Sequence, residues 1–456
     1  MALSIIILAA GQGTRMKSNR PKVLHHLAGK AMLQHVVDTS RVLDPDQIIV
    51  VVGHKADLVK EVMTGQALTF IEQNQLLGTG HAVAQCLPIL NSGNDVLVLT
   101  ADVPLVTQTT IGSLLKDSTD VDVNVLSFMP ANPFGYGRIV RNSDQTVCAI
   151  VEQKDASQSE QAIIESNSGI IFIAGSRVDQ LIGLLDNNNA QSEYYLTDVI
   201  KHASTMGQQV NATICTDPNE VNGVNNQQQL SEVESHYRKR QVNKLMIEGV
   251  KLYDPTRIDI RGELTVGKDV VIDINCIFEG EVSLGDNVHI GANCIIRHTK
   301  IESNTNILPM TMIDQSTIGQ NANIGPFSRL RPGTECSDDI KIGNFVETKK
   351  ASIGKGSKVS HLSYVGDATI GKNVNIGAGT ITCNYDGANK FQTIIEDDVF
   401  IGSDTQLVAP VTIGRGATIG AGSTITKDTP EQQLTLSRSK QVTISSWKKP
   451  AKVDKG

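Results

Sequence analysis

Four residues near the N-terminus have the types and spacing that phosphate chemistry needs. Gly11 and Gly13 follow an apolar run, and Arg15 and Lys22 lie close behind them. Glycine lets the backbone approach a ligand closely, and amides in such a turn can cradle phosphate. The two basic side chains add positive charge where charge develops in a phosphoryl-type transfer. The turn lacks the third glycine of the dinucleotide fingerprint and a Walker lysine, so a merely structural turn stays an alternative.

A carboxylate follows a second apolar run, Asp95–Thr100. We predict that this run is a buried strand, and ligands of open α/β sheets bind at the carboxyl ends of the strands. Asp102 is therefore well placed to hold Mg²⁺ through oxygen. Taken alone, Asp102 would be more typical of a turn or a helix N-cap.

Alternating strands and helices must position these residues. Apolar runs predict strands, and helical spacing predicts helices between them. The predicted strands are Leu3–Leu8, Gln47–Val52, Asp95–Thr100 and Asp122–Phe128, and the predicted helices lie near Met32–Val37 and at His81–Leu90. Strands separated by helix-sized segments indicate βαβ units. We therefore predict a largely parallel, doubly wound α/β domain over residues 1–226.

A linking helix is predicted after this domain, over residues 227–248, because apolar residues recur there at helical intervals. Gly249 is a natural stop for this helix. Ser231 and Glu234 have capping-box spacing, but a start near Asn226 also stays open.

A small aliphatic residue returns at about every sixth position from about Leu264 to Thr426, and a glycine follows many of them directly. A period of six fits neither an α-helix nor a strand with alternating faces. It is the hexapeptide signature of a parallel β-helix, in which three hexads form one triangular coil. We predict this fold over residues 249–456 and expect each glycine to turn a corner. The basic end, Trp447–Gly456, is predicted to belong to a covering arm with a frayed end.

Three polar stretches interrupt the hexads and indicate a second site. They contain Arg331, Lys349 and Lys390, and His361 lies in the same region. Excursions from a solenoid tend to line its binding surface. A lone histidine on the outside of a coil would more often be a surface residue. The three basic side chains suit an anionic ligand and favour a functional role for His361.

The composition argues against several kinds of partner. The chain of 456 residues has a formal net charge of -7 and only 4% aromatic residues, so a general affinity for nucleic acid is not expected. Its seven scattered cysteines indicate neither a disulfide framework nor a zinc site. The apolar run Ile5–Ala10 is too short for a signal peptide or a membrane span. We expect a cytoplasmic protein.

Leu8–Met16 together with Lys22 resembles the signature of the sugar-1-phosphate nucleotidyltransferases. With the hexapeptide β-helix behind it, the chain resembles over essentially its full length the bifunctional bacterial N-acetylglucosamine-1-phosphate uridylyltransferase/glucosamine-1-phosphate N-acetyltransferase family. The resemblance implies a Rossmann-like nucleotidyltransferase domain, a left-handed β-helix and a homotrimer. It also implies acetyl transfer from acetyl-CoA to glucosamine 1-phosphate, then Mg²⁺-dependent uridylyl transfer from UTP with release of pyrophosphate. The product, UDP-N-acetylglucosamine, would supply bacterial envelope precursors.

The resemblance implies one set of residues for the uridylyl-transfer site. The residues implied to bind UTP and UDP-N-acetylglucosamine are Leu8, Ala9, Ala10, Gly11, Lys22, Gln73, Gly78, Thr79, Thr100, Ala101, Asp102, Gly137, Glu152, Asn167 and Asn225. Arg15 and Lys22 are implied to contact the phosphates in catalysis. Asp102 and Asn225 are implied to hold Mg²⁺. Gln73, Gly78 and Thr79 are implied to recognise the uracil base.

Three positions depart from the family pattern. The family usually has glycine before the metal-binding aspartate, often with tyrosine before that, and here these residues are Ala101 and Thr100. The extra methyl group of Ala101 beside a metal ligand is expected to tighten the site. A family glutamate in the Asn225 loop is Asn222 here.

The resemblance places acetyl transfer on the β-helix, between subunits of a trimer. His361 is implied to be the general base that takes a proton from the 2-amino group of glucosamine 1-phosphate. The implied sugar-phosphate ligands are Arg331, Lys349, Tyr364, Asn375 and Lys390, and the implied acetyl-CoA ligands are Ala378, Asn384, Tyr385, Ser403, Ala421 and Arg438. We add the hypothesis that Glu347 orients His361 from the adjoining coil.

Two rival interpretations have to be weighed against this prediction. One is a monofunctional sugar-1-phosphate nucleotidyltransferase whose β-helix is structural or regulatory. The other is a non-catalytic interaction subunit on the same scaffold. Neither would need His361 and Arg331 together with their companions, and a non-catalytic subunit would be free to lose Arg15, Lys22 and Asp102. Since all are present, the sequence favours the bifunctional enzyme.

Overall fold

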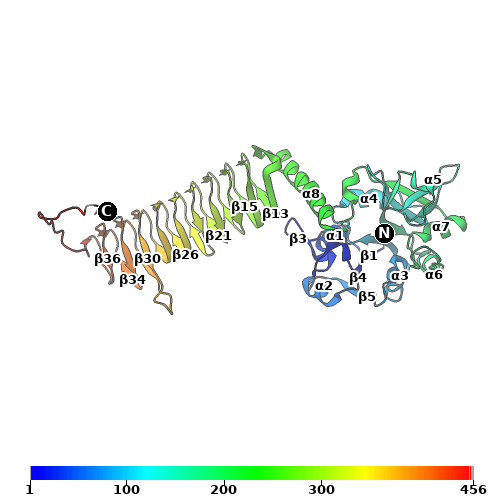
Figure 1. The fold of residues 1–456 in the computed structure, drawn as a ribbon, viewed down its shortest axis with the longest axis horizontal. Helices are drawn as coiled ribbons and strands as arrows, with labels where there is room; N and C mark the ends of the chain where they lie inside the picture. Colours follow the sequence, from blue (N-terminus) through cyan, green and yellow to red (C-terminus); the bar gives the residue numbers. More distant parts are fainter. Residues whose placement is uncertain (1, 451, 453–456) are drawn as a thin grey trace. The chain divides into compact units, whose positions relative to one another are not determined.

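The structure, a computed structural model, describes residues 2–450 and 452 (Figure 1). It divides into two compact units at residue 240, inside the helix α8, Gln227–Ile247. The first part of α8 therefore belongs to one unit and its last part to the other. The described residues include no helix that is both long and apolar enough to cross a membrane.

The first unit is built on one nine-stranded sheet with helices between its strands. Its principal strands are β1 Leu3–Ala9, β4 Gln47–Val52, β5 Thr69–Glu72, β6 Asp95–Thr100, β7 Val123–Phe128, β8 Arg138–Arg141, β9 Val147–Val151, β10 Ser166–Ile173 and β11 Val210–Ile214. Its helices are α1 Met32–Arg41, α2 Ala56–Val62, α3 Thr79–Ala84, α4 Gln108–Lys116, α5 Gln158–Gln161, α6 Val178–Gly183 and α7 Asp198–Thr205, and a small separate hairpin joins β2 His26–Leu27 to β3 Lys30–Ala31.

The sheet is buried on both faces. Its main strand order is β11-β7-β10-β6-β1-β4-β5, and β1 pairs in parallel with β4 and β6. Ile5 and Ile7 of β1 pack into one core cluster, while Ile6 packs into another. Successive side chains of a strand point to opposite faces, so both faces must be covered. This burial explains why β1 is apolar at every position except Ser4, and it confirms the predicted doubly wound arrangement.

Two details of this unit differ from the sequence prediction. β10 runs antiparallel to β6 and β7, so the sheet is mixed rather than largely parallel. The helix predicted at His81–Leu90 is shorter: α3 ends at Ala84, and a separate 3₁₀ turn covers Leu87–Ile89. Pro88 has no N–H to donate and disfavours the helical conformation of the residue before it, which accounts for the early end.

Helix α8 begins where the second of the two predicted starts lay. The side chain of Asn226 accepts a hydrogen bond of 2.8 Å from the backbone N–H of Gln229, so Asn226 caps the helix. Leu230 and Val233 pack in a core cluster of the first unit. The last turns contribute Val242 and Leu245 to the core of the second unit.

The second unit is a parallel β-helix whose coils stack one upon another (Figure 1). Its strands run from β12 Lys251–Leu252 to β37 Leu434–Thr435 and include β13 Ile258–Val266, β15 Cys276–Leu284, β23 Arg329–Leu330, β25 Lys341–Asn344, β26 Glu347–Ile353, β27 Lys358–His361, β28 Tyr364–Ile370, β29 Asn375–Ile376, β30 Ile381–Cys383 and β33 Gln406–Val408. One core of stacked aliphatic residues fills the coils from end to end.

The register gives the length of each coil. Ile307 pairs with Ile324 (a separation of 17) and Ile324 with Ile342 (a separation of 18). One coil is longer, because Ile376 pairs with Ile401 at a separation of 25. The extra residues form the predicted loop after β30. The hexapeptide prediction is therefore confirmed, with one side of some coils shortened by a residue.

The glycines of the hexads have a different role from the one predicted. Gly291 does not adopt a left-handed conformation; Asn293, two residues later, does, with φ of 61°. A Cβ on Gly291 would lie 2.7 Å from the backbone nitrogen of Pro309, and one on Gly343 would lie 1.9 Å from the carbonyl oxygen of Ser360. These positions exclude a side chain because the next coil is too close, not because they turn the corner.

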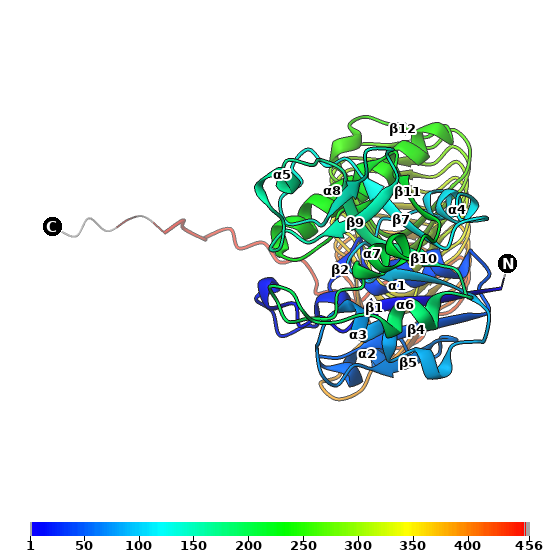
Figure 2. The ribbon, with the colours of Figure 1, turned by 90° about the vertical axis from the view of Figure 1, so that its right-hand side faces the viewer.

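The C-terminal tail covers little of its own chain. β37 adds one last strand to the coil stack. Beyond it the chain is exposed, and Figure 2 shows it leaving the coils as an extended segment. Trp447 is 64% exposed. In this single chain the tail is not the predicted covering arm, and residues 451 and 453–456 lie outside the described residues.

Candidate functional sites

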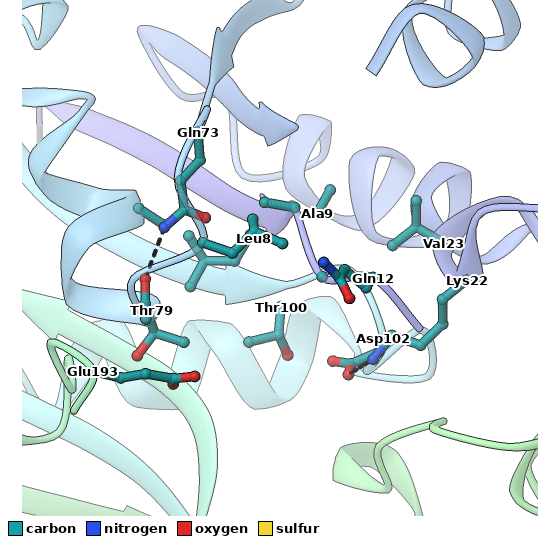
Figure 3. Close-up of a pocket in the computed structure, with 15 residues that line it drawn as sticks. Leu8, Ala9, Gln12, Lys22, Val23, Gln73, Thr79, Thr100, Asp102 and Glu193 are labelled. Atoms are coloured by element: carbon teal, nitrogen blue, oxygen red, sulfur yellow. Dashed lines mark hydrogen bonds and ion pairs between the residues drawn. The ribbon is translucent and has the colours of Figure 1, made fainter. Parts of the chain in front are cut away.

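A cavity of about 490 Å³ opens in the first unit, at the carboxyl ends of β1 and β6. It gathers most of the residues predicted to bind the nucleotide (Figure 3). Those that line it are Leu8, Ala9, Ala10, Gly11, Lys22, Gln73, Gly78, Thr79, Thr100 and Asp102. Gln12, Val23, Leu76, Ala82 and Glu193, which were not predicted, also line it.

One end of the site carries a compact group of charged and polar side chains. Lys22 Nζ lies 2.5 Å from Asp102 Oδ2 and 3.2 Å from Asn225 Oδ1. Arg15 donates to the same Asn225 oxygen at 2.9 Å. A Cβ on Gly13 would lie 2.6 Å from the Cβ of Lys22, so a glycine is required for the turn to bring the lysine in. These four predicted residues, which come from three distant segments of the chain, therefore converge.

The other end is formed by the loop before α3. The backbone N–H of Gly80 donates to the carbonyl oxygen of Tyr194 at 2.8 Å, and Leu196 donates to the hydroxyl of Thr79 at 3.0 Å. A Cβ on Gly78 would lie 2.6 Å from the same Tyr194 oxygen. The segment 193–196 thus clamps the loop and brings Glu193 to the cavity. This segment has no spacing or composition that marks it in the sequence.

Thr100 and Ala101 behave differently although they are neighbours. The side chain of Thr100 lines the cavity, and its hydroxyl oxygen is buried with no hydrogen-bond partner in the described part of the chain. Ala101 is fully buried in a core cluster and does not line the cavity. The predicted tightening of the metal site by the Ala101 methyl group is therefore wrong, because that methyl packs in the core.

The three residues predicted to hold the sugar form a cluster of their own: Gly137 directly precedes β8, Glu152 directly follows β9, and Asn167 lies on β10. The backbone N–H of Asn167 donates to the carbonyl oxygen of Gly137 at 2.9 Å, and a Cβ on Gly137 would lie 3.4 Å from Glu152 Oε1. Thr197, which was not predicted, donates to that Glu152 oxygen at 3.1 Å. Burial raises the pKa of Glu152 despite this bond, and nearby carboxylates, Asp198 first, raise it further.

On the β-helix, the predicted base has a partner that the sequence analysis missed. Nδ1 of His361 lies 3.0 Å from Oδ1 of Asn344, and the two residues face each other in the register of β25 and β27. Glu347 instead accepts a bond of 2.7 Å from Arg331. The structure thus contradicts the hypothesis that Glu347 orients His361. Asn344 lies 17 residues, or one coil, before His361. This spacing is the only feature of the sequence that would have identified it as the partner.

Three of the predicted basic side chains lie close to one another on the β-helix. Lys390 and then Arg331 lower the pKa of Lys349 by charge repulsion, which places the three cations near one another. Tyr364 lies directly opposite Glu347 where β28 pairs with β26. Asn375 lies on β29, which pairs with the histidine strand β27.

The residues predicted for the coenzyme lie further along the coil stack, in contacts that link neighbouring coils. Asn384 Nδ2 donates to Asp367 at 2.5 Å. Arg438 donates to the carbonyl oxygen of Ala421 at 2.9 Å, and the carbonyl oxygen of Ala378 accepts from the backbone of Asp404, the residue after Ser403, at 2.7 Å. Tyr385 is exposed in the long loop.

Comparison with family models agrees with this division of the chain. The MobA-like NTP transferase domain matches residues 5–168. The GMPPB C-terminal domain matches residues 260–346, and the bacterial transferase hexapeptide (six repeats) matches residues 392–427. Hexapeptide repeats and parallel coils together identify the second unit as a left-handed β-helix.

Curated relatives are similar over nearly the whole chain. The bifunctional protein GlmU of Cupriavidus pinatubonensis is 53% identical over 450 residues, which cover 99% of both chains. That of Marinobacter nauticus is also 53% identical over 450 residues, with the same coverage. That of Ralstonia nicotianae is 52% identical over 453 residues, covering 99% of this chain and all of the relative.

Proposed function

The chain belongs to the family of the bifunctional GlmU proteins, and on that premise we propose how its two units share the chemistry. It is a bifunctional enzyme, an N-acetylglucosamine-1-phosphate uridylyltransferase and a glucosamine-1-phosphate N-acetyltransferase. We assign uridylyl transfer to the cavity of the first unit and acetyl transfer to the His361 region of the second. The observation that carries the first assignment is the convergence of Arg15, Lys22, Asp102 and Asn225 at one end of the cavity.

The oxygens of Asp102 and Asn225 suit Mg²⁺. A carboxylate and an amide oxygen converge on one positive charge, the ammonium of Lys22, so the same oxygens fit a hard cation. The described residues contain no group of three or more His, Cys, Asp or Glu side chains that would enclose a metal. Two protein ligands, with substrate phosphates and water filling the other positions, are typical of Mg²⁺ in nucleotide sites. Bound there, Mg²⁺ would neutralise charge on the phosphates.

In uridylyl transfer, a phosphate oxygen of N-acetylglucosamine 1-phosphate attacks the α-phosphorus of UTP in line. The bond to the β-phosphate oxygen breaks, and pyrophosphate leaves with its electron pair. Arg15 and Lys22 stabilise the charge that builds on the leaving group. Glu152 and Asn167 hold the acetylated sugar, with the Gly137 backbone close against them.

In acetyl transfer, the 2-amino group of glucosamine 1-phosphate attacks the thioester carbon of acetyl-CoA, and coenzyme A leaves through sulfur. The Oδ1 of Asn344 accepts a hydrogen bond from the N–H at Nδ1 of His361, which leaves the lone pair of Nε2 free to take the proton from the amine. Arg331, Lys349 and Lys390 balance the charge of the sugar phosphate.

We further propose that three copies assemble through the β-helix. Large apolar side chains follow one another on one corner of consecutive coils: Met310, Phe327, Phe345 and Leu362. The rings of Phe327 and Phe345 stack with centroids 5.4 Å apart, yet Phe345 is 55% and Leu362 is 63% exposed. A row of exposed apolar groups is typical of an interface. Since Leu362 directly follows His361, a second copy on this row would help to complete the acetyl-transfer site.

The assembly is tested by measuring mass in solution by light scattering. We expect a trimer for the wild type and a shift to smaller species for Phe345→Ser, with acetyl transfer reduced and uridylyl transfer retained. A monomeric wild type with full acetyl transfer would contradict the proposal.

Since the seven cysteines are all free thiols in the structure, we also propose that the enzyme works in the cytoplasm.

The division of labour is tested by a crossed pair of variants. Coenzyme A release with glucosamine 1-phosphate and pyrophosphate release with UTP are measured for the wild type, His361→Ala and Asp102→Asn. We expect each variant to lose one activity by at least about 100-fold and to keep the other. If folded wild type released pyrophosphate but no coenzyme A, the monofunctional alternative would replace the bifunctional one.

A further inference from the structure

Two acceptors hold the side-chain amide of Gln73 in one orientation. Its Nε2 lies 2.9 Å from the carbonyl oxygen of Gly78 and 3.0 Å from Nδ1 of His81. A carbonyl oxygen only accepts, so the amide nitrogen must be the atom that faces it. The two hydrogens of that nitrogen are then shared between Gly78 and His81. Figure 3 shows the Gln73 oxygen on the opposite side of the amide, turned toward Leu8.

The bond to Gln73 also determines the tautomer of His81. Nδ1 accepts a hydrogen from Gln73, so the ring proton resides on Nε2. The amide of Gln85 lies 3.3 Å from Nε2, and a half-turn of that amide lets its oxygen accept the Nε2 proton. The hydrogen bonds are therefore all donated in one direction, from Gln73 at the cavity wall to His81 and from His81 to Gln85 at the half-buried end of α3.

We propose that His81 is a positioning residue that selects the nucleobase by holding the Gln73 oxygen toward the cavity. The inference rests on the proposed uridylyl transfer, in which Gln73 faces the base. N3 of uracil carries a hydrogen and donates to an acceptor such as the Gln73 oxygen. N3 of cytosine has no hydrogen and would meet that oxygen lone pair to lone pair. An inverted Gln73 amide would present N–H and favour cytosine instead.

Of the two groups that orient the Gln73 amide, His81 is the one that a substitution can remove without changing a residue at the cavity wall. Gly78 holds one hydrogen of the amide through its backbone, whatever the side chains are. His81 holds the other and does not line the cavity. Loss of its acceptor therefore frees the amide to invert more often, while the cavity wall and the group around Lys22 stay in place.

The test is the ratio of kcat/KM for UTP to that for CTP, with N-acetylglucosamine 1-phosphate as the second substrate. We expect His81→Ala to lower this ratio by about five- to tenfold, the effect of one hydrogen bond, while kcat with UTP changes less than about twofold. His81→Asn should keep the wild-type ratio, because Asn Oδ1 stands where the histidine Nδ1 accepted. His202→Ala is the matched control, since His202 lies on α7 and has no bond to Gln73.

An unchanged ratio in His81→Ala, or an equal fall in His81→Asn, would overturn the inference, since the ring would then act only as packing. Should His81→Ala not fold, His81→Lys presents a donor to Gln73 and must lower the ratio further. If the wild type turns over UTP but the His81 variants leave the UTP-to-CTP ratio unchanged, only this inference is refuted. Wild type with no UTP turnover refutes the proposed function as well.

Discussion

The hydroxyl of Thr100 is buried at the cavity wall without a partner among the described residues, so it is available to a ligand in the cavity. An unpaired buried hydroxyl costs free energy in the empty protein. We therefore expect Thr100→Val to raise the free energy of unfolding by about 1 kcal/mol and to raise KM for the nucleotide. Urea unfolding and steady-state kinetics on the same preparation measure both. An unchanged KM would show that bound substrate does not use the hydroxyl.

Glu152 leads to a prediction about pH. Its pKa is raised in the folded protein, chiefly by burial, so the folded state disfavours the charged form. Below the ordinary value of 4.5 the group is protonated in both states and carries no penalty; the penalty grows as pH rises through and above that value. Glu152→Gln should therefore unfold at higher urea than wild type at pH 7.5, with a smaller gain at pH 5.

The control for this prediction is Glu61→Gln, because Glu61 is exposed on α2. The control should unfold like the wild type at both pH values. A gain in Glu152→Gln that stayed constant between the two pH values would mean that charge burial is not its cause.

At this scale, the sequence predicts the residues whose chemistry is in their type and spacing, such as Lys22 and Asp102. Thr197 and Asn344 escape prediction because they act only through a neighbour that the fold brings to them. Ala101 is the converse case: its position beside Asp102 suggested a role at the site, but the alternation of the backbone turns its methyl group into the core.

At the scale of elements, the coils of the β-helix tolerate side chains at their hexad glycines least. A Cβ on Gly343 would lie 1.9 Å from a backbone oxygen that cannot move without shifting the next coil. We expect Gly343→Ala to lower the free energy of unfolding of this unit by about 3 kcal/mol or more. Calorimetry, which resolves the two units if they unfold separately, is the measurement.

Gly112→Ala provides the matched comparison. Gly112 lies on α4, and a Cβ there would meet nothing within 4 Å. Because alanine favours helix over glycine, this change should stabilise the first unit by about 0.5–1 kcal/mol. Destabilisation by both substitutions to a similar extent would contradict the argument that the next coil is what excludes a side chain.

Element prediction succeeded where burial controls the sequence and was less accurate elsewhere. β4 and β6 lie within the core, so their apolar runs mark their ends, Gln47–Val52 and Asp95–Thr100. The direction of β10 is set by its pairing with β6 and β7, which are distant in sequence, and no local pattern encodes it. The reason why these hexad positions require glycine could not be predicted either, because the atoms that exclude a side chain belong to the next coil.

At the scale of the whole molecule, the two activities should differ in their need for metal. Asp102 and Asn225 belong to the first unit, whereas the site proposed for acetyl transfer contains the cations Arg331, Lys349 and Lys390, which would balance the sugar phosphate without a metal. Removal of divalent metal with EDTA should abolish pyrophosphate release and leave coenzyme A release within about twofold of its initial rate. Added Mg²⁺ should restore the lost activity. Equal sensitivity of both activities would argue against the assignment of the metal to the first unit.

The end of α8 has a consequence for self-association. A stack of parallel coils is an unfinished sheet at its first coil, where backbone N–H and C=O groups would be free to pair with another chain. Val242 and Leu245 of α8 join the core of the coil stack and so act as a lid on it. Repeat folds need such terminal caps to stay soluble. A β-helix released without this helix would be expected to grow end to end into fibres rather than remain a discrete particle.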